Sequence, residues 1–275
     1  MELLYNSNHK KIHIDDFQHP ADKRTVNTLI KLPAFQKILT FLSENTVEKT
    51  YNLMNDSSFL KISEKMSPKI FSMIKEAMDM FDVDVAPRVY VDRNYAMTVK
   101  LDGMKSPYLV FSSSVLEQYD DGMLWALIAS EIAGIKASHA TIKFVDNIIQ
   151  IAKPIFPFAI DVAVTLALND WYRNKAYTYD RAILLASEDF EMTARHILFG
   201  EADLTTLENL HLSQPNNDYY KQAYEFLQRS GINGVYQKIS TVFSREQWMA
   251  SRYIELYNWY FGGQYEDILE RSKCI

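Results

Sequence analysis

An acidic side chain stands in the middle of a long apolar run. Residues 129–139 read ASEIAGIKASH, and Glu131 lies there between Ser130 and Gly134. The run from Met123 to Phe144 predicts helix. A carboxylate in an apolar helix must be paired or protonated, because an isolated buried charge is costly. It is also the group that activates a metal-bound water in many hydrolases.

The order of predicted strands and helices along the chain around Glu131 is informative. A predicted strand ends in serines at 112–114, Asp120-Asp121 follows, and the Glu131 helix comes next. Some fifty residues later, NDWYRNKAYTYDRAILLASED (169–189) predicts a second helix, which carries Asp180-Arg181-Ala182. If the two helices pack together, Arg181 is the expected partner of the Glu131 carboxylate.

This series resembles the zinc endopeptidase family that includes the bacterial heat-shock protease HtpX and the CaaX-prenyl protease. Further segments carry the resemblance: HPADK (19–23), APRVYVDRNYAMTV (86–99) and GGQYEDIL (262–269). In that family the first helix carries H-E-x-x-H, whose histidines bind zinc and whose glutamate activates a water. The second helix supplies a glutamate ligand. The resemblance implies a metallopeptidase-like fold over nearly the whole chain.

The zinc ligands that the resemblance implies are all replaced here. The two histidine positions hold Ser130 and Gly134, and the glutamate position holds Ala176. The family's carboxylate, aspartate and arginine are retained as Glu131, Asp180 and Arg181. Glycine and alanine side chains cannot coordinate a metal, so we expect no zinc and no other cofactor. The resemblance therefore predicts an inactive member of the family, a pseudoprotease.

Two interpretations stay open for the space that zinc and its ligands would occupy in the family. Tyr177 or Tyr179 from the second helix would fill it and bond to Ser130 or Glu131. Alternatively, the volume remains an open cleft that accepts a peptide. The resemblance implies that the segment Asn94-Tyr95-Ala96-Met97 holds an extended peptide by strand addition. We thus expect a peptide or protein partner that is bound and not cleaved.

A different metal site is the alternative. Glu131, His139 and Asp180 would form an unconventional hydrolase site, with zinc as its cofactor and His196 as a further ligand. His139 follows Glu131 by two helical turns, about 11 Å, which is too far for one ion. A hydrogen-bonded His139 near a helix end is the competing interpretation.

Composition limits the other functions. The net charge is −6 with scattered acids, which argues against nucleic-acid binding. The single cysteine, Cys274, excludes an internal disulfide, and no signal peptide is recognisable, so we expect a cytoplasmic protein. The apolar stretch 148–168 contains Lys153, Asp161 and two prolines. It predicts a kinked core hairpin or, alternatively, a weak membrane-surface anchor that would make the chain a peripheral membrane scaffold.

The pattern along the chain predicts a predominantly α-helical α+β fold with one small antiparallel or mixed sheet. We expect one peptidase-like domain over 1–275. It comprises N-terminal helices (1–82), a small sheet (83–115), the degenerate active-site helices (116–200) and C-terminal helices (201–275). Within the sheet region, strands are expected at 87–93, 95–101 and 108–114.

Overall fold

The computed structural model describes residues 11–96, 98–152, 162–200, 210–228 and 244–273. The helices before the sheet are α1 (Ile14–Phe17), α2 (Pro20–Lys31), α3 (Pro33–Glu44), α4 (Val47–Ser58) and α5 (Pro68–Met80). The strands are β1 (Leu60–Lys61), β2 (Arg88–Asp92), β3 (Val99–Asp102) and β4 (Tyr108–Ser112). The later helices are α6 (Ser113–Gln118), α7 (Asp121–Lys136), α8 (His139–Ala152), α9 (Val162–Ser187), α10 (Phe190–Phe199), α11 (Asp218–Gln228), α13 (Met249–Phe261) and α14 (Gln264–Lys273). The predicted α+β, mainly helical fold is confirmed.

Prolines begin several of the early helices. Pro20, Pro33 and Pro68 each occupy the first helical turn of α2, α3 and α5. Proline is favoured there because its missing N–H has no intrahelical partner in any case. Pro33 therefore stands at the boundary between α2 and α3.

The sheet is mixed, with the strand order β1-β2-β4-β3. β2 and β4 are parallel, with Val91 opposite Phe111, whereas β1 and β3 pair antiparallel with their neighbours. The expected strand over 95–101 is wrong in its first half. β3 begins only at Val99, and the described residues at 93–96 and 98 are not in a strand.

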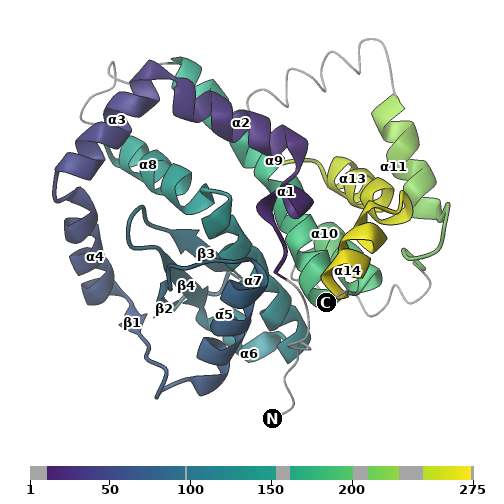
Figure 1. Cartoon of the computed structure of the whole chain (residues 1–275), viewed down its shortest axis with the longest axis horizontal. Coiled ribbons are helices and arrows are strands. Elements are labelled where there is room, and N and C mark those ends of the chain that lie inside the picture. The colour runs from purple at the N-terminus through teal and green to yellow at the C-terminus, as the bar shows by residue number, and fades with distance from the viewer. Residues whose placement is uncertain (1–10, 97, 153–161, 201–209, 229–243, 274–275) are drawn as a thin grey trace.

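Helix α7 lies at the centre of the molecule, between α5, α9 and β3 (Figure 1). Buried side chains such as Leu124, Trp125, Ile128 and Ile132 cover much of its circumference. A helix that is apolar on most sides must be enclosed on most sides, which explains its central place. Helices α11, α13 and α14 lie on the other side of α9 from the sheet (Figure 1).

The single helix expected over 123–144 is wrong. Helix α7 ends at Lys136 and α8 begins at His139, because Ser138 takes a left-handed backbone conformation with φ of 64°. His139 therefore does not continue the face of α7 that carries Glu131.

Candidate functional site

The crossing of α7 and α9 brings Glu131, Gly134 and Tyr179 together. The Tyr179 hydroxyl donates a hydrogen bond to Glu131 Oε2 at 2.9 Å. A Cβ atom added to Gly134 would lie 2.7 Å from the Tyr179 hydroxyl oxygen and 3.1 Å from Leu101 Cδ2. Burial raises the pKa of Tyr179 well above its usual value, so the hydroxyl keeps its proton at neutral pH. Tyr179 thus occupies the space in front of Gly134.

At the other two positions where the resemblance implies a zinc ligand, neither side chain is a carboxylate or an imidazole. The Ser130 hydroxyl is buried and donates to the Leu127 carbonyl oxygen at 2.8 Å, one helical turn back. Ala176 on α9 carries only a methyl group. A side chain longer than a hydrogen at 134 would collide with Tyr179. The residues present at this crossing do not fit a zinc ion.

Asp180 and Arg181 contact residues of the C-terminal helix α13, and Arg181 does not pair with Glu131 as expected. Asp180 is buried and accepts two hydrogen bonds from Arg252, at 3.0 and 2.6 Å. The Arg181 guanidinium lies 4.9 Å from the ring centre of Trp259. The expected Glu131–Arg181 pair is therefore wrong for the described residues, where a neutral hydroxyl bonds to the Glu131 carboxylate.

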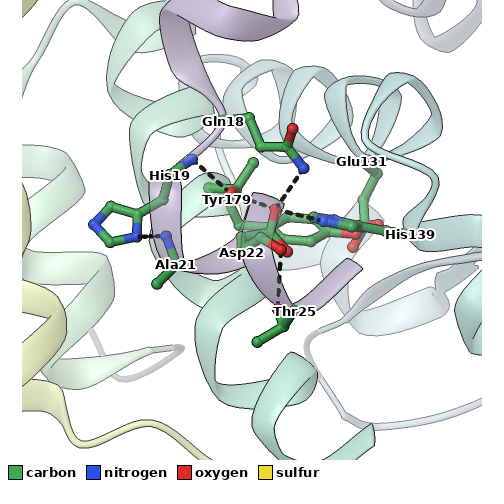
Figure 2. Close-up of polar contacts among 9 residues, drawn as sticks. Gln18, His19, Ala21, Asp22, Thr25, Glu131, His139 and Tyr179 are labelled. Carbon is green, nitrogen blue, oxygen red and sulfur yellow. Dashed lines mark hydrogen bonds and ion pairs between the residues drawn. The ribbon is translucent and has the colours of Figure 1, made fainter. Parts of the chain in front are cut away.

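A second polar cluster adjoins Tyr179 and involves Asp22 of α2 (Figure 2). Asp22 Oδ2 accepts hydrogen bonds from Thr178 at 2.7 Å and Gln18 at 3.2 Å, and it contacts His139 Nε2 at 2.9 Å. Burial would raise the pKa of Asp22, but His139 and these hydrogen bonds together lower it. The His139 ring also stacks on Tyr179, with ring centres 5.4 Å apart. Asp22 was missed in the sequence, although it belongs to the HPADK segment.

The residues of the alternative metal site each have a separate environment. Glu131 bonds to Tyr179, His139 contacts Asp22, and Asp180 bonds to Arg252. His196 is partly buried, and the loss of hydration lowers its pKa. Within the described ranges, no three His, Cys, Asp or Glu side chains converge as metal ligands would.

Tyr177 lies on a different side of α9 from Tyr179. Its ring packs against His19, with ring centres 4.6 Å apart, and its hydroxyl accepts a hydrogen bond from Gln247. His19 in turn contacts Glu255 at 3.1 Å. Of the two tyrosines considered for filling, Tyr179 is the one that meets Gly134.

Lys175, one turn of α9 before Tyr179, was also missed. Its ammonium nitrogen lies 5.1, 4.9 and 5.3 Å from the ring centres of Trp171, Tyr172 and Tyr179. Burial and then the nearby charge of Lys143 lower the Lys175 pKa to about 8. A lysine surrounded by apolar rings was detectable only as the spacing of aromatic residues at 171, 172 and 179.

In the expected peptide-binding segment, residues 94–96 form a turn with its own hydrogen bonds. Asn94 Oδ1 accepts from the Ala96 N–H at 3.0 Å, and the Asn94 carbonyl accepts from the Ser114 hydroxyl at 3.2 Å. The Tyr95 side chain is 91% exposed. Met97 lies outside the described residues. These backbone groups do not form the ladder edge that strand addition requires.

The stretch 148–168 is described only at its two ends, since 153–161 lie outside the described residues. Ile151 at the end of α8 and Val162 and Leu166 at the start of α9 are exposed. In the part of the chain that the structure describes, every helix is too short or too polar to cross a bilayer.

Comparison with known proteins gives one distant relative. The chain is 28% identical over 186 residues to the Plastoglobule-localized metallopeptidase 48, chloroplastic, of Arabidopsis thaliana. The aligned part covers 66% of this chain and 54% of that protein, so the chain spans about half the length of this curated relative. No protein-family model and no solved structure matches the chain. The likeness supports a metallopeptidase-like relationship.

Proposed function

We propose that this metallopeptidase-like chain is a non-catalytic protein that binds a peptide or a partner protein without cleaving it. One observation carries the proposal: the Tyr179 hydroxyl lies against Gly134 and bonds to Glu131. The carboxylate that would activate a water is engaged by a neutral phenol, and the position of a metal-binding histidine is a glycine covered by the same phenol.

Hydrolysis of a peptide bond needs a nucleophile stronger than bulk water. A zinc ion provides it by lowering the pKa of a bound water to about 7. Gly134 and Ala176 have no side-chain donor for such an ion, and the Ser130 hydroxyl is turned to the Leu127 carbonyl oxygen. Glu131 alone would face a water of unchanged pKa, so the proposal assigns the chain a binding role.

The turn at 94–96 supplies the contact surface in this proposal. Tyr95 projects from it, and an exposed aromatic side chain gives a partner a large contact area. Because the turn satisfies much of its own backbone, binding here depends on side chains more than on an added strand.

A peptide-retention experiment tests this proposal. The full chain is incubated with a pool of N-acetylated random hexapeptides, and the retained and free peptides are weighed by mass spectrometry over time. We expect retained peptides of unchanged mass, and about tenfold weaker retention by Tyr95→Ala, the loss of one interface anchor. Tyr224→Ala, an exposed tyrosine on α11, is the matched control and retains peptides normally.

Two results would contradict the proposal. Time-dependent cleavage products that disappear with a chelator would show a working metallopeptidase. Failure of the wild-type chain to retain any peptide would remove the binding role.

A second candidate role is attachment to a lipid surface, favoured by the exposed Ile151, Val162 and Leu166. The relative is named for its location at plastoglobules. Apolar side chains of this kind can enter the boundary between headgroups and acyl chains.

Vesicle sedimentation tests the lipid role. We expect the chain to sediment with phosphatidylcholine–phosphatidylglycerol vesicles, and the triple serine variant at 151, 162 and 166 to stay in solution. Leu53→Ser, an equally exposed apolar residue on α4, should sediment like the wild type. Equal sedimentation of the triple variant would rule this role out.

A further inference from the structure

The ammonium of Lys175 lacks the acceptors that its charge requires. Three aromatic rings lie about 5 Å from it, those of Trp171, Tyr172 and Tyr179. Ring faces attract a cation, but they are weak hydrogen-bond acceptors. Among the described residues, none accepts a hydrogen bond from this ammonium or pairs with it. An ammonium has three N–H donors, so the group is under-satisfied.

The acids near Lys175 are already engaged elsewhere. Those whose charges act on it are Glu131, Asp22 and Asp146. Glu131 accepts from Tyr179 and Asp22 contacts His139. Asp146 accepts two hydrogen bonds from the Arg245 guanidinium, at 2.6 and 3.0 Å. Each carboxylate thus has a closer partner than Lys175.

A second lysine adds to the positive charge. Lys143 of α8 influences Lys175 more strongly than any of the acids does. Its charge also acts on Asp102 at the end of β3. Like charges held near each other in a partly buried place are costly unless an anion joins them.

We propose that Lys175 binds the carboxylate of a peptide beside the Tyr179–Glu131 contact. This rests on the proposed peptide-binding function and names the chemistry that the ligand must carry. Lys175 and Tyr179 are both only half-buried, so this part of α9 is reachable from solvent. A charge-assisted hydrogen bond from an ammonium to a carboxylate is among the stronger polar contacts. The carboxylate comes from a peptide C-terminus or from an acidic side chain.

Matched peptide pools distinguish these sources. The first two pools of N-acetylated random hexapeptides differ only in a free or an amidated C-terminus. Two further amidated pools carry Glu or Gln at one fixed position. Retention on the full chain is measured by mass spectrometry. We expect the free-acid or the Glu pool to be retained about tenfold better than its neutral partner, as for a hydrogen bond to a charged group.

Variants test whether Lys175 causes the preference for carboxylate-containing peptides. Lys175→Met should reduce it to less than about twofold, whereas Lys175→Arg, which keeps the charge, should retain it. Lys49→Met, at an exposed position on α4, should leave it unchanged. If Lys175→Met does not fold, the acylation rate of Lys175 in the wild type, compared between N-acetylglycine and N-acetylglycinamide, decides the question.

The outcomes separate this inference from the proposed function. Equal retention of acid and amide pools would overturn the carboxylate site and leave peptide binding intact. If no pool is retained, peptide binding itself falls, and acylation of Lys175 by an amine-reactive ester decides the inference. Slower acylation in N-acetylglycine than in N-acetylglycinamide would support a carboxylate site, and equal rates would overturn it.

Discussion

Replacing Lys175 by methionine is expected to stabilise the protein at neutral pH. Methionine has a similar length and no charge, and it packs well against aromatic rings. The lysine side chain is half-buried among Trp171, Tyr172 and Tyr179, where the charged form loses hydration. Removing that charge removes its desolvation cost.

The pKa shift sets the size of the effect. Burial and Lys143 lower the Lys175 pKa from 10.5 to about 8. Since one pKa unit corresponds to about 1.4 kcal/mol, the shift corresponds to about 3 kcal/mol. Attraction to the rings and partial solvation reduce this cost, so we expect Lys175→Met to raise the free energy of unfolding at pH 7 by about 1–3 kcal/mol.

The pH dependence identifies the cause. The folded-state pKa lies below the unfolded value, so the unfolded chain binds the extra proton between about pH 8 and 10.5. The cost is therefore fully present below pH 8 and disappears as the pH rises toward 10.5. The advantage of Lys175→Met over the wild type should shrink over the same interval.

Urea denaturation of wild type and variant at pH 7 and pH 10 measures this directly. Lys49→Met is the control, because it removes a charge from an exposed site on α4. A destabilised Lys175→Met variant at pH 7, or a gain that stays the same at pH 10, would refute the reasoning.

Three further predictions concern the same region. Gly134→Ala should lower the free energy of unfolding by about 1 kcal/mol, because the added methyl group clashes with Tyr179. In a Tyr179→Ala background the same change should raise it by about 1 kcal/mol, because alanine favours helix more than glycine does. Additive effects of the two substitutions in a double-mutant cycle would contradict the contact. Asp22→Asn should lower the free energy of unfolding at neutral pH. Because the folded-state pKa of Asp22 lies below 3.8, the difference in free energy of unfolding between variant and wild type should fade as the pH drops below that value. A difference that persists at pH 2 would refute the assignment. Asp180→Asn, which removes the buried charge that pairs with the partly buried Arg252, should cost about 3 kcal/mol in urea denaturation, against almost nothing for the exposed Asp218→Asn. Equal effects would show that the pair contributes little.

The sequence predicted the architecture well because its signals were local. Prolines at helix starts and runs of β-branched and aromatic residues depend on near neighbours along the chain. They placed the N-terminal helices before the sheet and put β2 and β4 close to their observed positions. The break at Ser138 was missed because the apolar pattern continues through it, and only the left-handed backbone of one serine separates the helices.

The contacts of the site were harder to predict because they join distant segments. Asp22 and Thr178 are 156 residues apart, and no local pattern pairs them. The expected Glu131–Arg181 pair relied on both residues lying on facing helix surfaces. In the structure Arg181 turns toward Trp259, and Tyr179, two residues earlier, faces α7. Which side of a helix faces a neighbour depends on the packing of the whole core.

The claim that this chain holds no catalytic zinc is tested most directly by elemental analysis of the purified protein after incubation with zinc and gel filtration. Peptidase activity is followed in parallel, with and without a chelator. Because Ser130, Gly134 and Ala176 offer no ligand set, we predict far less than one zinc per chain and no chelator-sensitive cleavage. One tightly bound zinc per chain together with chelator-sensitive cleavage would contradict the account.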